Sequence, residues 1–114
     1  MRAEPRVRLT SHATRRIRER LPELVADVKA AGGRLDRVVY AEISQAIVAG
    51  RMAKSTPTFM NRRKRAQASR GHTRYVWPPD ESRAWIVRRK HEDGCEVWHV
   101  LTVMAPLQRR VEAA

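Results

Sequence analysis

Cysteine, aromatic residues and acidic residues are all scarce in this chain of 114 residues. It has one cysteine, Cys95, and its three Trp, two Tyr and one Phe make up 5% of the residues. A single cysteine cannot form an internal disulfide or a cysteine-based metal site, and the four histidines are not at zinc-ligand spacing. We therefore expect no metal and no other cofactor.

Long apolar runs are also absent. No stretch approaches the roughly 18 apolar residues of a membrane helix, and the charged residues 1–6 are not followed by the apolar segment of a signal peptide. The sequence therefore predicts a cytoplasmic protein without a membrane partner. Its hydrophobic fraction of 42% is that of a folding chain, and its length suits one domain spanning residues 1–114.

Asp and Glu number 12 against 24 Lys and Arg, so the formal net charge is +12. A charge of this sign and size favours a polyanionic partner, with nucleic acid preferred over a phospholipid surface. A GC-rich genome raises arginine content, but it does not remove acids from one segment. No acid occurs between Glu42 and Asp80, an interval that contains Arg51, Lys54, Arg62, Arg63, Lys64, Arg65, Arg70 and Arg74.

Helical patterns occupy the first half of the chain. Thr10 or Ser11 can cap a helix that begins at His12, and apolar spacing continues past Pro22 as one kinked helix or two short ones. The next helix has Asp36 as its predicted cap and Gly50 as its left-handed C-terminal residue. Its predicted buried side consists of Val39, Ile43, Ala46 and Ile47.

Strand patterns follow a predicted basic loop at 51–71, for which a loop containing a short helical turn is the alternative. They cover 73–77, 84–89 and 96–104, with a frayed tail from 106. Together these elements predict an α+β domain in which N-terminal helices pack on a C-terminal antiparallel meander. Trp85 and Trp98 are predicted core residues; Trp85, Val87 and Arg89 are expected to share one face of their strand, and Trp98, Val100, Thr102 and Met104 one face of theirs.

Three segments resemble a known superfamily. They are the helix start His12-Ala13-x-x-Arg16-x-x-x-Arg20, the hairpin that joins 74–77 to 85–88, and the final strand 97–103. Over residues 9–105 the chain resembles small toxin-like domains related to the barnase, EndoU, colicin and RelE ribonucleases. The resemblance implies helices packed on a twisted antiparallel sheet and, as in many members, RNA cleavage without a metal. The chain departs from the simplest members at 22–36 and in the basic loop.

Metal-free RNA cleavage needs an activated 2′-hydroxyl, a stabilised phosphorane and a protonated leaving oxygen. His12 is a candidate acid or base, and Arg16 shares its helix face as a phosphate clamp. With Arg74 and Thr102 these residues form the predicted groove between the first helix and the sheet. His99 is the second histidine candidate, and its face stays undecided because both faces of its strand are apolar.

Further residues are candidates for contacts with nucleic acid. Tyr75 and Trp77 either stack on unpaired bases or belong to the core, and the basic run at 61–65 either contacts phosphates or is merely solvated. The full candidate binding set is Arg20, Arg62, Arg63, Lys64, Arg65, Arg70, Tyr75, Trp77, Arg88 and Arg89.

The leading hypothesis is an RNA-binding domain of ribonuclease-toxin type that cleaves RNA without a metal, with RNA preferred over DNA as the partner. A non-catalytic nucleic-acid-binding module, such as a phage-type host-takeover regulator, is the first alternative. A protein-binding inhibitor that presents arginine to an acidic partner is the second. An inhibitory protein partner is also compatible with the toxin hypothesis.

Overall fold

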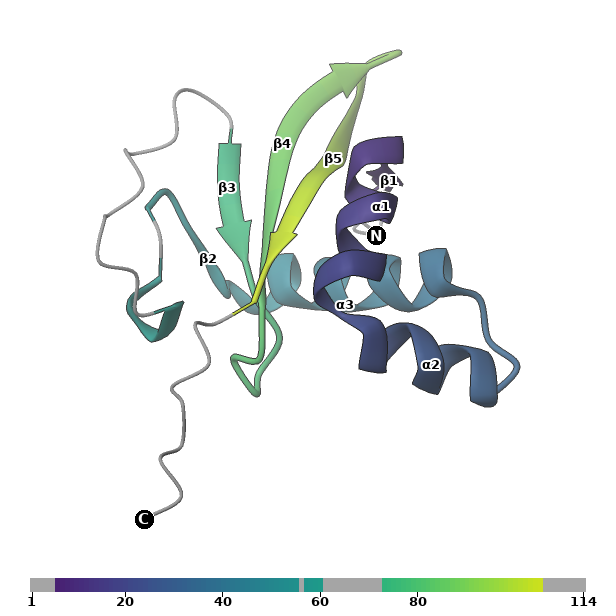
Figure 1. The fold of residues 1–114 in the computed structure, drawn as a ribbon. Helices are drawn as coiled ribbons and strands as arrows, with labels where there is room; N and C mark the ends of the chain where they lie inside the picture. Colours follow the sequence, from purple (N-terminus) through teal and green to yellow (C-terminus); the bar gives the residue numbers. More distant parts are fainter. Residues whose placement is uncertain (1–5, 56, 61–72, 106–114) are drawn as a thin grey trace.

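In the computed structural model, residues 6–55, 57–60 and 73–105 form three helices and a five-stranded sheet (Figure 1). The α+β class predicted from the sequence is confirmed. The strand order is β1-β5-β4-β3-β2. The elements in chain order are β1 (Arg6–Leu9), α1 (Ser11–Arg20), α2 (Pro22–Ala30), α3 (Leu35–Ala49), β2 (Met52–Ala53), the short 3₁₀ helix η1 (Thr58–Met60), β3 (Thr73–Val76), β4 (Ala84–Glu92) and β5 (Cys95–Met104).

The predicted antiparallel meander is present as β3, β4 and β5, but the sheet has two further strands. β1 pairs in parallel with β5, and β2 pairs with β3 inside the segment 51–71 that was predicted to be a loop. That segment also contains η1, a short helical turn of the kind that the prediction allowed, so the loop prediction is wrong for 52–53. Residues 61–72 and the predicted tail from 106 lie outside the described residues.

Local chemistry explains the helix boundaries. The Thr10 hydroxyl accepts a 3.0 Å hydrogen bond from the Ala13 backbone N–H, so Thr10 is the cap of α1. Pro22 begins α2, where its fixed φ suits a first turn, and the chain therefore forms two helices. Asp36 is not the cap of α3, because the helix begins at Leu35 and Asp36 therefore lies in its first turn. Gly50 has φ +76°, which confirms the predicted left-handed end.

The main core lies between the helices and one face of the sheet, here called the helix face. Ala13 and Ile17 from α1 and Ile43 from α3 are fully buried against sheet residues in a single cluster. Trp85 is 0% exposed and Trp98 is 4% exposed, which confirms the prediction that both rings belong to the core. The opposite face of the sheet, here called the second face, carries no helix longer than η1 within the described residues (Figure 1).

A bulge in β5 changes which side chains share a face. Ile86 pairs with Thr102 while Val87 pairs with Val100, so Leu101 has no partner on β4. Val100 packs in the helix-face core, but Met104 belongs to the separate cluster on the second face. The prediction that Trp98, Val100, Thr102 and Met104 share one face is therefore wrong, since the extra residue reverses the alternation after it. β4 has no extra residue, and Trp85 and Val87 both pack in the helix-face core as predicted.

Candidate nucleic-acid interface

Four neighbouring strands contribute one row of side chains to the second face. The register pairs Arg8 with His99, His99 with Arg88, and Arg88 with Thr73. Residues paired directly across strands point to the same side. His99 lies between Trp98 and Val100, whose side chains are in the helix-face core, so the row points away from the helices. We call Arg8, His99, Arg88 and Thr73 the cross-sheet row.

Glu92 holds two members of the cross-sheet row. Its Oε1 lies 3.0 Å from His99 Nε2, and its Oε2 lies 3.2 Å from Arg8 Nη2. The side chains are 17% exposed for His99, 33% for Glu92 and 63% for Arg8. The carboxylate therefore fixes the orientation of a largely buried imidazole beside a guanidinium that reaches solvent.

A tight hairpin positions this carboxylate. Asp93 and Gly94 form the two-residue turn between β4 and β5, with φ +51° and +75°. Two successive positive φ values match the twist of the flanking strands, and the Asp-Gly sequence suits them. Glu92 is the last residue of β4 and lies on the same face as Arg88, four residues earlier.

Basic residues dominate this end of the second face. Arg88 and Lys90 are both exposed and lie two residues apart on β4. Arg6 of β1 pairs with Val97 of β5, two residues before the row on each strand. Only Glu92 contributes an acidic contact to the row among the described residues. The arrangement can contact several phosphates at once, and the guanidinium groups can do so with two hydrogen bonds each.

The other end of the second face is apolar. Met60 from η1 is 0% exposed and Tyr75 from β3 is 5% exposed, so Tyr75 has the core role that the sequence left open. Trp77 is half-buried, and its ring lies 5.7 Å from that of Phe59 in an edge-to-face arrangement. Base stacking on Tyr75 would require this cluster to open, so the aromatic part of the candidate site receives less support than the basic part.

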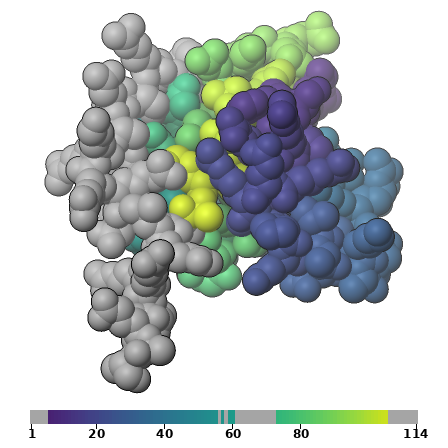
Figure 2. Space-filling view, in the orientation of Figure 1, coloured from purple at the N-terminus to yellow at the C-terminus, as the bar shows by residue number. Residues whose placement is uncertain are grey.

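The first helix lies along the edge of β5, as Figures 1 and 2 show. β1 ends opposite Val100, so the edge of β5 beyond that residue has no neighbouring strand. The Thr10 hydroxyl donates to the Val100 carbonyl at 2.9 Å, and Arg20 donates to the Val103 carbonyl at 2.6 Å. Arg20, a predicted nucleic-acid contact, therefore satisfies a backbone acceptor that the sheet leaves unpaired.

His12 and Arg16 are one turn apart on this helix, as predicted. Arg16 Nε lies 3.4 Å from His12 Nε2, and Arg16 also pairs with Glu19 at 3.0 Å. His12 is exposed, and its imidazole contacts a cation, Arg16, whereas His99 contacts a carboxylate. This environment orients His12 less firmly than Glu92 orients His99.

The predicted groove does not gather all of its members. Arg74 pairs with Val87 on the helix face and donates to the Thr73 carbonyl at 2.8 Å, whereas Thr102 pairs with Ile86 on the second face. Arg89 also lies on the helix face, 3.4 Å from Glu96. Of the predicted site residues, only His99 and Arg88 belong to the cross-sheet row. The predicted contacts Arg62, Arg63, Lys64, Arg65 and Arg70 lie outside the described residues.

Glu92 and Arg8 were not predicted as site residues from the sequence. Arg8 joins the row only because β1 pairs in parallel with β5, a contact between the two ends of the chain that no local pattern indicates. Glu92 carried a weak signal, since it precedes the Asp-Gly turn and lies seven residues before His99. A predicted two-residue hairpin could have brought the two side chains together.

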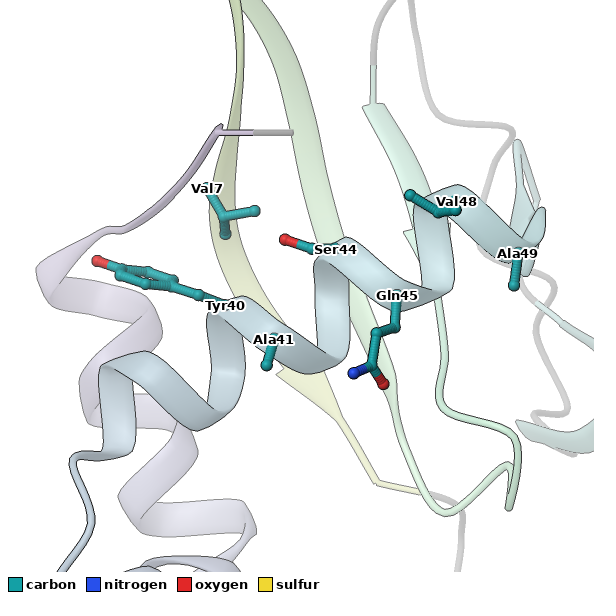
Figure 3. A pocket seen from close by; sticks show the side chains of 7 residues that line it. All are labelled: Val7, Tyr40, Ala41, Ser44, Gln45, Val48 and Ala49. Carbon is teal, nitrogen blue, oxygen red and sulfur yellow. The ribbon is translucent and has the colours of Figure 1, made fainter. Parts of the chain in front are cut away.

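A cavity of a different character lies elsewhere. It has a volume of about 630 Å³ and is lined by Val7 from β1 and by six α3 side chains (Figure 3). None of the seven lining residues is charged. Val7 alternates with Arg8, so the cavity lies on the helix side of β1 and not at the cross-sheet row. The arginines of the cross-sheet row are better suited to bind a phosphate than this uncharged lining.

Comparison with protein-family models, with curated proteins and with solved structures finds no match for this chain. No helix in the described part of the chain is long and apolar enough to cross a bilayer. In residues 6–55, 57–60 and 73–105, no three His, Cys, Asp or Glu side chains are grouped so that they could hold a metal ion. Any function must therefore be argued from the site itself.

Proposed function

We propose that this chain binds RNA through the cross-sheet row and the basic residues beside it. The observation that supports the proposal is the row itself, in which Arg8, His99 and Arg88 occupy three adjacent strands on the face away from the helices. Neighbouring strands lie about 4.8 Å apart, so the guanidinium-bearing residues Arg8 and Arg88 flank His99 from the two adjacent strands. A polyanionic strand crossing the sheet would meet these groups in succession.

RNA is preferred over DNA on a separate ground. Phosphate contacts alone do not distinguish the two, because recognition of RNA at a given position requires a contact with the ribose 2′-hydroxyl. The resemblance to ribonuclease toxins favours RNA, and His99 is a polar group in the row that can hydrogen-bond to a hydroxyl.

The test is a binding titration with a fluorescently labelled single-stranded RNA. The variant Arg88→Ser/Lys90→Ser removes two exposed cations from the second face, and Arg18→Ser/Lys29→Ser removes two exposed cations from α1 and α2. A charged hydrogen bond contributes about 1.5–3 kcal/mol, so loss of two contacts should weaken binding at least about tenfold. The matched control has the same net charge and should retain most of the affinity.

Two outcomes would contradict this proposal. Equal losses in both variants would show that total charge, and not the second face, determines binding. Absence of RNA binding by the wild-type chain at low salt would remove the proposed function altogether. Cleavage of the bound strand is a separate claim, because binding needs only cations whereas cleavage needs a group that moves a proton.

A further inference from the structure

We propose that His99, Glu92 and Arg8 form a proton-transfer site for RNA cleavage, with His99 as the catalytic base and Glu92 as its positioning residue. This inference rests on the proposed RNA binding and adds a reaction to it. The motivating geometry is the continuous contact from Arg8 Nη2 to Glu92 Oε2 at 3.2 Å and from Glu92 Oε1 to His99 Nε2 at 3.0 Å.

The carboxylate selects one state of the imidazole. A carboxylate oxygen accepts a hydrogen bond but cannot donate one when ionised, so Glu92 favours the tautomer with its proton on Nε2 of His99. Nδ1 then carries the lone pair and is the proton acceptor. Arg8 binds the second oxygen of Glu92 and fixes the orientation of the carboxylate.

Rigid elements support all three residues. His99 is in β5, which has a strand on each side at this position, because it pairs with Arg8 of β1 and Arg88 of β4. Glu92 is fixed by the two-residue turn that follows it. The charged groups facing His99 are thus Arg8 from β1 and Arg88 and Glu92 from β4. A site built on paired strands holds catalytic geometry better than one on an exposed helix residue such as His12.

The reaction follows from these positions. His99 Nδ1 takes the proton of the ribose 2′-hydroxyl, the 2′ oxygen forms a bond to phosphorus, and the bond from phosphorus to the 5′ oxygen breaks. The departing 5′ oxygen takes a proton from water, and the protonated imidazole of His99 returns its proton to the hydroxide that remains. The products are a 2′,3′-cyclic phosphate and a 5′-hydroxyl, and no oxidant or reductant is consumed. Arg88, paired with His99, is placed to stabilise the negative charge of the phosphorane.

The experiment uses the full chain and one labelled single-stranded RNA, with RNA binding and RNA cleavage measured on the same samples. His99→Gln should lower the cleavage rate at least about 100-fold, the lower range for a general base, and this loss should far exceed any loss of RNA affinity measured on the same sample. His91→Ala is the matched control, because His91 is exposed on the opposite face of β4. This variant should cleave the RNA at the wild-type rate.

Glu92 is tested by a graded pair of variants. Glu92→Gln should slow cleavage about tenfold or more and change the pH profile, and Glu92→Asp should restore part of the rate because it restores an ionised acceptor. Nitrogen NMR of the His99 ring gives a readout that does not depend on activity. The wild type should show the Nε2-protonated tautomer, and Glu92→Gln should lose this preference, since an amide can donate as well as accept.

Each outcome separates the two proposals. RNA that is bound by the wild type but left intact would overturn the proton-transfer site and leave the binding function in place. Absence of binding would remove the proposed function. Cleavage that proceeds unchanged in His99→Gln would overturn the assignment of the base and make His12 the residue to examine. A wild-type ring protonated on Nδ1 would overturn the role given to Glu92.

Discussion

At the scale of single residues, one carboxylate joins the helices to the sheet. Glu42 of α3 accepts hydrogen bonds from Arg83 Nε at 2.8 Å, from Arg83 Nη2 at 2.5 Å and from the Trp85 indole N–H at 2.5 Å. Its side chain is 17% exposed and that of Arg83 is 16% exposed. The hydrogen bonds that Arg83 donates to Glu42 raise the pKa of Arg83, an effect that burial partly opposes. Arg83 therefore keeps its positive charge next to the core.

Removal of this carboxylate should destabilise the fold. Glu42→Ala leaves a largely buried guanidinium and the Trp85 indole N–H without their acceptor, and an unsatisfied polar group costs about 1–3 kcal/mol. Urea unfolding should show a loss of that size. Glu23→Ala, at an exposed position of α2, should change stability by less than about 0.5 kcal/mol. Equal midpoints for the two variants would contradict a structural role for Glu42.

Asp80 gives a prediction about acid pH. The Ser82 hydroxyl donates to Asp80 Oδ1 at 2.8 Å and the Ser82 backbone N–H donates at 3.1 Å, and these bonds lower the pKa of Asp80 from its usual 3.8. A lowered pKa in the folded state stabilises the fold above the unfolded value, and the gain is lost as pH falls through the folded value. Ser82→Ala should raise the Asp80 pKa, measured by carboxyl-carbon NMR titration. An unchanged titration would show that the hydroxyl bond has no effect in solution.

At the scale of elements, the start of α1 depends on Thr10. Its hydroxyl accepts from the Ala13 N–H and donates to the Val100 carbonyl, so one side chain both caps the helix and attaches it to β5. Thr10→Ala should therefore lower the free energy of unfolding by about 1–2 kcal/mol. Ser11→Ala is the control, because Ser11 is exposed in the first turn and its loss should have little effect. A larger loss in Ser11→Ala would contradict the assignment of the cap.

The elements predicted correctly are those with local signals. The apolar spacing that includes Val39, Ile43 and Ala46 identified α3, and Gly50 identified its end. β1 was missed because its four residues gain their pairing from β5, about ninety positions later in the chain, and a short alternating segment does not reveal such a partner. The bulge at Leu101 was missed for a similar reason, since pairing register is set by both strands together.

In the candidate site, too, the residues with a local signal were predicted and the contacts set by long-range strand pairing were not. His99 was identified because histidine is chemically distinctive, and Arg88 because it lies in a basic strand. Their assembly into a row, and the contacts of His99 with Glu92 and of Glu92 with Arg8, depend on strand register that no local pattern gives. Arg74 was placed in the groove by its nearness to the basic loop, but strand alternation turns it to the helix face.

At the scale of the whole molecule, the net charge of +12 should control the strength of RNA binding. Each neutralised phosphate releases condensed counterions, so the logarithm of the association constant falls linearly with the logarithm of salt concentration. For a single strand the slope is about −0.7 for each contact, and about six contacts would give a slope near −4. Fluorescence titrations with one RNA at several salt concentrations measure this slope.

The slope also locates the contacts, which an affinity at one salt concentration does not do. Arg88→Ser/Lys90→Ser removes two proposed phosphate contacts, so its slope should be shallower than that of the wild type by about 1.4. Arg18→Ser/Lys29→Ser has the same net charge but should keep the wild-type slope, because its lost cations lie on α1 and α2. If the two slopes fall together, binding follows the overall field of the protein. If only the first falls, the phosphates cross the second face of the sheet, on which His99 and Glu92 lie.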